Sequence, residues 1–273
     1  MNPKLVLITG ASGGIGMATI RAFERQGWWV LAGTRAPERV VPSERVRPIF
    51  LDPASAADRA QIVALVQREF GGRLDCLVNN AGYAQSGPVE LIDDVAWRSQ
   101  MEINVIAPAL LTAALLPALR AAQGSIINIS SVLGRTGFAW QGAYCASKFA
   151  LEGWTEALLL ETQGQGVRVR LVEPGTTRSN FGRAMKVVEV PSGLYERVAK
   201  RFAGLRAQLA ERAQPPDRVA AAIIKAATQS HAGFRQSVGK DAWLTLGLLR
   251  CLPGGAYFML SKAIARRFLG LRP

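Results

Sequence analysis

The sequence predicts a doubly wound α/β fold with a mainly parallel, seven-stranded sheet and helices on both faces. Three observations lead to this prediction. Short apolar runs alternate with longer helical stretches, which is the pattern of repeated strand–helix–strand units. The apolar runs are nearly continuous, as strands covered on both faces require. No linker or change of composition interrupts the chain before residue 175, so we expect one domain.

Each element follows from its local pattern. Strands are expected over residues 5–9, 28–33, 46–52, 75–79, 125–130, 167–174 and 234–239. Helices are expected over residues 15–26, 54–70, 95–121, 142–161 and 216–230. Gly27 and Gly71 suit helix ends, because glycine adopts left-handed conformations readily. Pro108 is expected to bend the third helix, and residues 175–215 are expected to form a loop with short helical pieces.

Most of the excess positive charge lies in the C-terminal third of the chain. The net charge is +13, and residues 195–273 hold 14 Lys or Arg but only 4 Asp or Glu residues. This excess fits attraction to an anionic cofactor or substrate, attraction to an anionic membrane surface, or a merely solvated surface. No nucleic-acid partner is expected, because no nucleic-acid-binding motif accompanies the charge.

The last predicted helix, residues 256–269, is apolar but carries Lys262, Arg266 and Arg267. It could cover a pocket, pack on a partner subunit or lie on a membrane surface. Its polar and apolar residues are poorly separated, which favours packing within the protein or a dimer over membrane contact. We expect a homodimer or homotetramer.

The three cysteines, Cys76, Cys145 and Cys251, have no CxxC spacing. They argue against a disulfide framework or a zinc site and fit a reducing compartment. With a single histidine in the chain, no metal site is expected. We find neither a signal-peptide pattern nor about 20 uninterrupted apolar residues, so a cytoplasmic protein is expected.

A glycine-rich segment, TGASGGIG at residues 9–16, connects the first strand to the first helix. Glycine permits a tight turn and close approach of backbone N–H groups to a pyrophosphate, and the helix N-terminus adds partial positive charge. This context predicts a Rossmann-type dinucleotide site. The expected contacts are Gly10, Ser12, Gly14, Ile15 and Gly16.

The residues after the second strand indicate which dinucleotide binds. An acidic residue there would bond the ribose 2′-hydroxyl of NAD, but this chain has Gly33, Thr34 and Arg35. A guanidinium group suits a 2′-phosphate. The sequence therefore favours NADP(H), with NAD(H) as the alternative, and Arg39 could assist.

Polar residues gather where later strands end. Asn79–Gly82 (NNAG) ends the fourth strand, and Ser130 and Ser131 end the fifth. Tyr144 lies thirteen residues after Ser131, and Lys148 follows at i+4, on the same face of a helix. Ligands of open parallel sheets bind beyond the carboxyl ends of the strands, so these residues are expected to form one site.

Tyrosine has an ordinary pKa near 10, too high for a base at neutral pH. A nearby ammonium group favours the phenolate, so Lys148 is expected to lower the pKa of Tyr144. An oxidised nicotinamide would act in the same direction. A Tyr-x-x-x-Lys pair is common on helix surfaces, so the pair gains meaning only with the other motifs.

In these motifs the chain resembles the short-chain dehydrogenase/reductase family, in its single-domain branch. The resemblance covers about residues 4–239 and rests on residues in family order and spacing. These are TGASGGIG (9–16), Asp52, NNAG (79–82), Asn104, Ser131, Tyr144, Lys148 and Pro174-Gly175. It implies a hydride transfer between a nicotinamide cofactor and a carbonyl/alcohol pair.

The resemblance also implies roles. Tyr144 would exchange the proton with the substrate oxygen, Ser131 would hydrogen-bond that oxygen, and Lys148 would lower the pKa of Tyr144 and bind the nicotinamide ribose. Asn104 would hold a water in a proton relay, and Asp52 would contact adenine. The further implied cofactor contacts are Asn80, Ala81, Gly82, Pro174, Gly175, Thr176 and Thr177. The chain departs from the family pattern at Gly13, where many NADP-using members have a basic residue, and at Ser179, which represents a common threonine.

The expected substrate-side segments are residues 83–88, 133–140 and 181–195. They carry the apolar side chains Tyr83, Leu133, Phe138, Trp140, Phe181, Met185, Val187 and Val188, some of which could simply be core. We therefore expect a lipophilic alcohol or ketone. Residues 238–253 and the basic last helix resemble the steroid- and retinol-dehydrogenase-like subgroup.

These observations divide the chain into a dinucleotide-binding catalytic domain, residues 1–240, and a C-terminal helical extension of it, residues 241–273. The main hypothesis is an NADP(H)-dependent oxidoreductase. A non-catalytic dinucleotide sensor on the same fold is the alternative. The complete Ser131, Tyr144 and Lys148 set favours the enzyme, because a sensor needs none of them.

Overall fold

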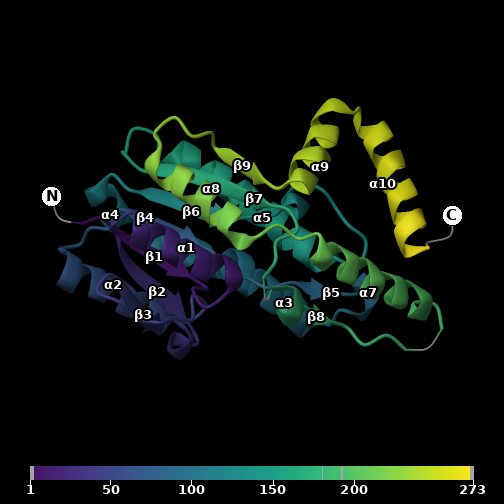
Figure 1. The fold of residues 1–273 in the computed structure, drawn as a ribbon, viewed down its shortest axis with the longest axis horizontal. Coiled ribbons are helices and arrows are strands. Elements are labelled where there is room, and N and C mark those ends of the chain that lie inside the picture. The colour runs from purple at the N-terminus through teal and green to yellow at the C-terminus, as the bar shows by residue number, and fades with distance from the viewer. Residues whose placement is uncertain (1–2, 180, 192, 271–273) are drawn as a thin grey trace.

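Seven parallel strands form the central sheet in the computed structural model, which describes residues 3–179, 181–191 and 193–270 (Figure 1). Their spatial order is β3-β2-β1-β4-β6-β7-β9. The strands are β1 (Leu5–Thr9), β2 (Trp29–Thr34), β3 (Val46–Phe50), β4 (Cys76–Asn79), β6 (Ser125–Ile129), β7 (Arg168–Pro174) and β9 (Arg235–Val238). The predicted Rossmann-type fold is confirmed, and every strand pairing in this sheet is parallel.

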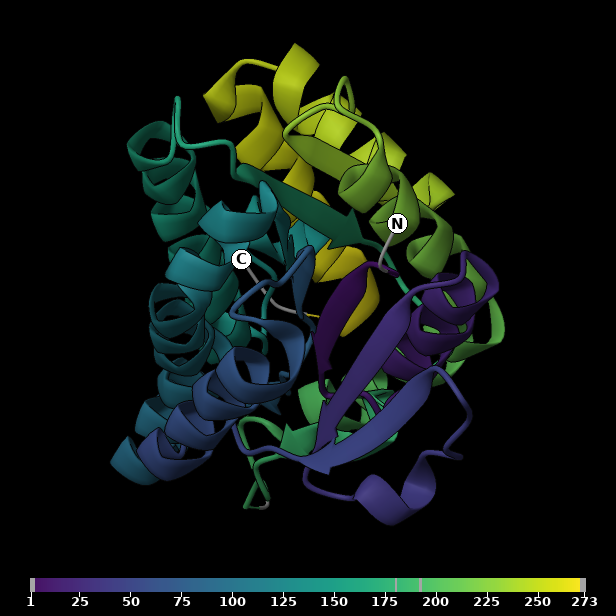
Figure 2. The same cartoon turned by 90° about the vertical axis from the view of Figure 1, so that its left-hand side faces the viewer.

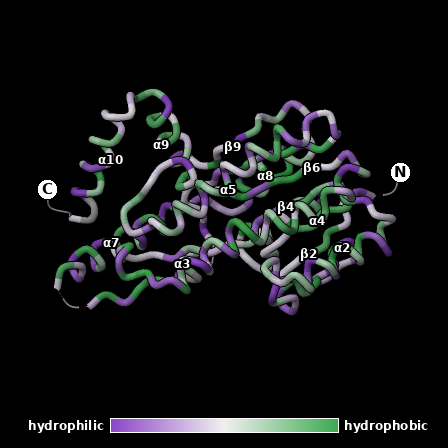
Figure 3. The backbone as a smooth tube through the Cα atoms, turned by 180° about the vertical axis from the view of Figure 1, so that it is seen from behind, coloured by the Kyte–Doolittle hydropathy of each residue, from purple (hydrophilic) through white to green (hydrophobic). Residues whose placement is uncertain are grey.

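Helices cover both faces of the sheet, as Figure 2 shows. One layer contains α1 (Gly14–Arg25) and α8 (Pro216–Thr228), and the other contains α2 (Ala56–Phe70), α4 (Ala107–Ala122) and α5 (Gly142–Glu161). Successive side chains of a strand point to opposite faces. Accordingly, Val6 and Ile8 of β1 pack in the first layer, whereas Leu5 and Leu7 pack in the second. In Figure 3 the hydrophobic stretches follow these central strands.

The third predicted helix is interrupted near Pro108, whereas only a bend was expected there. The helix is divided into α3 (Asp94–Met101), a π-helical turn η3 (Glu102–Ile106) and α4. Proline has no amide hydrogen, so Pro108 cannot donate the regular helical bond to the carbonyl of Asn104. The altered turn places Asn104 inside the protein, where its side chain is buried.

By length and composition, the helical stretch Asp94–Ala122 is long and apolar enough to cross a membrane. Its inner face is a core surface, because Leu111, Leu115 and Leu119 are fully buried against the sheet. Its outer face exposes Ile106 and Leu110.

The expectation of a loop with short helical pieces over residues 175–215 is wrong in part. A short helix, α6 (Phe181–Ala184), is followed by α7 (Glu196–Glu211), which has four turns. Val198 and Phe202 of α7 bury against Trp140, and this distant contact stabilises a helix in which only half of the other residues are apolar. A two-stranded parallel sheet, β5 (Gln85–Ser86) with β8 (Lys186–Val187), was also not expected.

The chain ends in two helices, α9 (Lys240–Cys251) and α10 (Gly254–Leu269), at the opposite end of the molecule from the N-terminus (Figure 1). Tyr257 of α10 is buried, and its hydroxyl lies 2.6 Å from Thr136 Oγ1. Several large apolar side chains of the two helices remain exposed: Trp243, Leu244, Phe258 and Met259. The predicted final helix is present, and it packs near the loop that follows β6.

We expect Leu115→Ala to lower the free energy of unfolding by about 2–5 kcal/mol, because a fully buried leucine leaves a cavity when truncated. The matched control is Leu194→Ala, at a side chain that is 82% exposed, with an expected change within about 0.5 kcal/mol. Urea unfolding followed by circular dichroism measures both. Equal losses in the two variants would contradict the assignment of α4 to the core.

Candidate active site

The predicted site residues meet at the carboxyl edge of the sheet. Because β1, β2, β4, β6 and β7 are parallel and in register, the residues that follow them emerge on the same side. The glycine loop, the NNAG segment, the Ser131 loop and the Pro174–Thr176 turn therefore become neighbours. This arrangement of the four segments agrees with the prediction of a single site at the carboxyl edge of the sheet.

The glycine loop is packed too closely for other residues. Gly10 has a φ of +63°, and an added Cβ would lie 2.8 Å from the Cα of Ala81. At Gly14, the first residue of α1, an added Cβ would lie 2.7 Å from Cβ of Ser179. The first turn of α1 contains no acidic residue that would oppose an anion. These features fit a pyrophosphate held by backbone N–H groups at a helix N-terminus.

Hydrogen bonds hold this loop to β4 and β2. Thr9 Oγ1 accepts bonds from the backbone N–H groups of Asn80 and Ala81, both at 3.0 Å. Asn80 Nδ2 donates to the carbonyls of Thr9 at 2.9 Å and Gly10 at 3.1 Å. The Asn80 amide therefore clamps the loop, a role the sequence did not indicate.

The residues expected at the adenosine end lie on the rim of the same edge. Ser12 Oγ lies 2.7 Å from Oγ1 of Thr34, the last residue of β2. Arg35 follows directly and is exposed to solvent. Asp52 follows β3, and its Oδ1 accepts a bond from the N–H of Ala54 at 3.1 Å. The positions suit the expected cofactor contacts, which stay predictions.

Tyr144 and Lys148 lie on the inner face of α5, with exposures of 8% and 6%. Lys148 Nζ donates to the carbonyl of Ile129, the last residue of β6, at 2.8 Å, and lies 5.8 Å from the centre of the Tyr144 ring. Ser131 follows two residues after Ile129, and its hydroxyl is near enough to Tyr144 to lower the pKa of the phenol. The structure thus brings all three predicted catalytic side chains together.

Burial controls the protonation of this cluster. Burial raises the pKa of Tyr144 to about 12, although the hydrogen bond with Ser131 acts to lower it. Burial lowers the pKa of Lys148 to about 8, while the charge of Glu152 acts to raise it. The protein alone therefore does not lower the pKa of Tyr144 as the sequence led us to expect. It holds Tyr144 as a phenol, the form that can donate a proton.

Asn104 holds the substrate-side loop rather than standing free. Its Oδ1 accepts from the N–H of Tyr83 at 3.1 Å, and its Nδ2 donates to the Tyr83 carbonyl and to Ser147 Oγ, both at 3.0 Å. The side-chain amide is thus engaged in protein contacts. The backbone carbonyl of Asn104, which Pro108 deprives of its regular helical donor, is the better candidate to bind the expected water.

The turn after β7 is fixed by two residues that the sequence analysis missed. Asp241 Oδ2 accepts a bond from the N–H of Thr176 at 2.7 Å. Gln214 accepts from the N–H of Arg178 at 2.8 Å through its backbone carbonyl and donates its own N–H to the Thr176 carbonyl at 3.0 Å. Both residues lie far from the turn in sequence, so no local sequence motif could have predicted these contacts.

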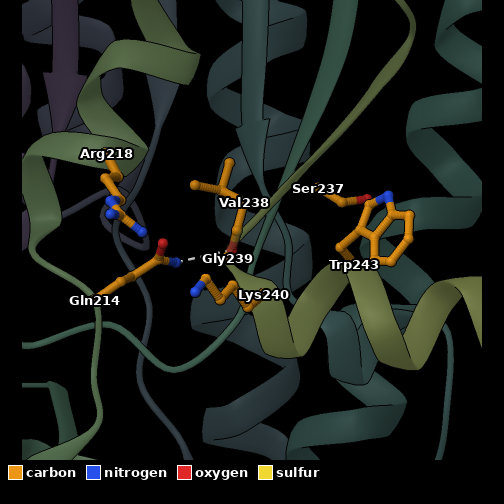
Figure 4. Close-up of a pocket in the computed structure, with 7 residues that line it drawn as sticks. All are labelled: Gln214, Arg218, Ser237, Val238, Gly239, Lys240 and Trp243. Carbon is orange, nitrogen blue, oxygen red and sulfur yellow. Dashed lines mark hydrogen bonds between the residues drawn. The ribbon is translucent and has the colours of Figure 1, made fainter.

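A cavity of about 580 Å³ lies on the outer side of this turn, between α8 and α9 (Figure 4). Its lining comprises Gln214, Arg218, Ser237, Val238, Gly239, Lys240 and Trp243. Gln214 Nε2 donates to the Val238 carbonyl at 2.8 Å, so Gln214 separates this cavity from Thr177. None of the predicted catalytic residues lines it, and we do not assign it to the substrate.

The expected apolar lining divides into two groups. The centre of the Phe181 ring lies 5.8 Å from the centre of the Tyr144 ring. In contrast, Phe138 and Trp140 pack with Val198 and Phe202 in a small core cluster beneath α7, so they serve the core. Of the remaining expected residues, Val187 is exposed, and the others are half-buried: Tyr83, Leu133, Met185 and Val188.

Comparisons with known proteins agree with this geometry. A family model described as short chain dehydrogenase matches residues 4–187. A 3-ketodihydrosphingosine reductase of Bacteroides thetaiotaomicron is 36% identical over 245 residues, covering 88% of this chain and 89% of that protein. A 17-beta-hydroxysteroid dehydrogenase type 6 of Bos taurus is 34% identical over 217 residues, covering 74% and 68%.

A solved structure of a short-chain dehydrogenase from Streptomyces avermitilis superposes with a TM-score of 0.82. It is 34% identical in sequence, and the match covers 97% of this chain and 98% of that one. The chain therefore belongs to the short-chain dehydrogenase/reductase family, and it is an oxidoreductase that binds a nicotinamide dinucleotide.

Proposed function

We propose that this oxidoreductase is NADP(H)-dependent and interconverts a carbonyl and an alcohol on a lipophilic, steroid-, retinoid- or lipid-like substrate. The observation that carries the proposal is the buried Tyr144 side chain, which has Ser131 as a neighbour and Lys148 and the Phe181 ring beside its own ring. It combines a proton donor with an apolar wall, as a ketone or aldehyde with a hydrocarbon body requires.

In the direction of reduction, Tyr144 donates its proton to the carbonyl oxygen of the substrate. Ser131 hydrogen-bonds the same oxygen and stabilises the negative charge that develops on it. Lys148 stabilises the phenolate left on Tyr144, and its bond to Ile129 fixes its direction. When bound, the nicotinamide supplies or accepts the hydride. In oxidation, Tyr144 takes the proton from the alcohol.

NADP(H) is favoured by the residues after β2. Arg35 is exposed at the carboxyl end of this strand, where a carboxylate would select the ribose hydroxyls of NAD. Arg39 ends the short helix η1 (Pro37–Arg39) nearby and adds a second positive charge. A guanidinium group forms charge-assisted bonds with a 2′-phosphate.

A lipophilic substrate is supported by the aromatic and aliphatic side chains around Tyr144. The Phe181 ring lies 5.8 Å from the Tyr144 ring, and Leu133 lies two residues after Ser131 in the same turn. The names of the Bacteroides and bovine relatives refer to a ketodihydrosphingosine and a hydroxysteroid, both lipophilic molecules. Apolar walls contribute binding energy to such a hydrocarbon body but little to a charged substrate.

We also propose that the enzyme is a homo-oligomer of the cytoplasm. The outer faces of α4 and α5 expose Leu110, Phe149 and Leu160 beside several alanines, an apolar surface that a second copy could cover. Its described cysteines are free thiols, which suits a reducing compartment.

We expect the purified protein to oxidise NADPH when long-chain or steroidal ketones are offered in a panel of carbonyl compounds. Tyr144→Phe should reduce kcat at least about 100-fold, because it removes the proton donor but keeps the ring against Phe181. NADPH binding to the variant, followed by fluorescence, is the control for folding. Unchanged turnover in the variant would overturn the mechanism, and binding without any turnover would favour a sensor.

Arg35→Ala should weaken NADPH binding about 10-fold or more and leave NADH binding nearly unchanged, because only NADPH carries the 2′-phosphate. Arg45→Ala serves as a control, since Arg45 is a half-buried arginine that bonds the Gly27 carbonyl at the opposite end of β2. Titration of both cofactors by fluorescence gives the ratio. Equal effects of Arg35→Ala on the two cofactors would remove the basis of the NADP(H) assignment.

Replacing Leu110 and Phe149 together by serine should convert an oligomer to a monomer, because the pair lies on the exposed apolar faces of α4 and α5. Light scattering coupled to size-exclusion chromatography gives the mass of each species. Trp243→Ser, at another exposed apolar side chain, is the control and should leave the mass unchanged. A wild type that is monomeric would refute this arrangement.

A further inference from the structure

Two acidic side chains lie deep in the protein behind the catalytic cluster, and the mechanism above does not use them. Glu152 is on α5 and is 4% exposed, and Glu173 is on β7 and is 1% exposed. Buried carboxylates without compensation strongly destabilise a fold, so such a pair requires a reason.

Arg235 of β9 binds both carboxylates. Its Nε lies 3.0 Å from Glu152 Oε2 and 3.5 Å from Glu173 Oε1. Glu173 is also bound by Arg135 at 3.4 Å and by the Ser237 hydroxyl at 2.8 Å. Both oxygens of Glu173 therefore have partners. In Glu152 only Oε2 does, because its other oxygen, Oε1, is buried without a hydrogen-bond partner.

The position of Glu152 connects it to the reaction. Tyr144, Lys148 and Glu152 follow one another at intervals of four residues, so they form a line on the inner face of α5. Packing around this line is tight: at Gly134 an added Cβ would lie 3.1 Å from Cγ of Glu152 and 3.2 Å from the Lys148 carbonyl. Both side chains are almost completely buried, so bulk water screens their charges little.

We propose that Glu152 is a positioning residue that keeps Lys148 protonated inside the protein, and that it thereby sets the upper pH limit of the reaction. The proposal rests on the assignment of Tyr144 and Lys148 to the proton transfer. Glu152 touches neither substrate nor cofactor and acts through the charge of Lys148.

The direction of the electrostatic effects supports this role. Burial lowers the pKa of Lys148 to about 8, and the charge of Glu152 opposes the decrease. Burial raises the pKa of Glu152, and Glu173 raises it further, while Arg235 lowers it. Arg235 therefore helps Glu152 remain ionised, and an ionised Glu152 helps Lys148 remain charged.

The charged groups around this line come from each neighbouring element. Glu173 lies on β7, Arg235 on β9 and Arg135 at the end of η4 (Val132–Gly134). On α5 itself, Glu156 binds Arg235 at 2.5 Å from the solvent-exposed side. Glu156 thus shares the partner of Glu152 but not its burial, which makes it a natural control.

We expect Glu152→Gln to move the alkaline limb of the pH profile of kcat/KM to lower pH by about one unit. Without the carboxylate, the pKa of Lys148 falls further, so Lys148 loses its proton at a lower pH. Glu156→Gln should leave the limb in place. Glu152→Asp, which retains the charge, should keep the limb near that of the wild type.

We expect the same shift in Glu152→Ala, which also removes the charge. This variant replaces Glu152→Gln in the experiment if the amide variant does not fold. A limb that stays in place in a folded Glu152→Gln or Glu152→Ala protein would overturn the proposal. So would an equal shift in Glu156→Gln, or a shift in Glu152→Asp as large as that in the amide variant.

A binding measurement separates this proposal from the proposed function. The family resemblance places Lys148 on the nicotinamide ribose, so NADPH affinity should fall above the pKa of Lys148. Fluorescence titrations over pH should show this fall about one pH unit lower in Glu152→Gln than in the wild type. If the wild type binds NADPH but reduces no carbonyl, the proposed function fails while this comparison still tests Glu152. Identical binding profiles in the two proteins would reject the role of Glu152.

Discussion

The parallel pairing of β1, β4, β6 and β7 is the constraint on which the site depends. Parallel strands align all their carboxyl ends at one edge of the sheet, which is where the ligands of such sheets bind. The glycine loop, Asn80, Ser131 and the Pro174–Thr176 turn come from four different strands. Their proximity follows from strand order and register rather than from any local attraction.

Burial shifts the pKa values of the two catalytic residues in opposite directions, raising that of Tyr144 and lowering that of Lys148. It disfavours the phenolate of Tyr144 and the ammonium of Lys148, so both side chains are pushed toward their neutral forms. A neutral Tyr144 suits proton donation, but a neutral Lys148 would not stabilise the phenolate that remains. On the same helix, the negative charge of the Glu152 carboxylate opposes the effect of burial and raises the pKa of Lys148.

The sequence was sufficient for the elements whose signals are local. The seven strands, the glycine loop and the helix that carries Tyr144 and Lys148 were predicted, with ends shifted by at most two residues. Long-range contacts explain the rest. The helix α7 depends on burial against Trp140, and Asp241 acts on Thr176 across 65 positions of the chain. The burial that reverses the expected pKa shift of Tyr144 likewise exists only in the folded protein.

The two C-terminal helices, α9 and α10, contact loops of the candidate site. Asp241, in the first turn of α9, fixes the turn expected to meet the nicotinamide, and Tyr257 of α10 bonds Thr136, five residues after Ser131. These contacts are consistent with the prediction that residues 241–273 form a helical extension of the same domain. A displacement of α9 would therefore move the turn after β7, and a displacement of α10 would move the loop that follows Ser131.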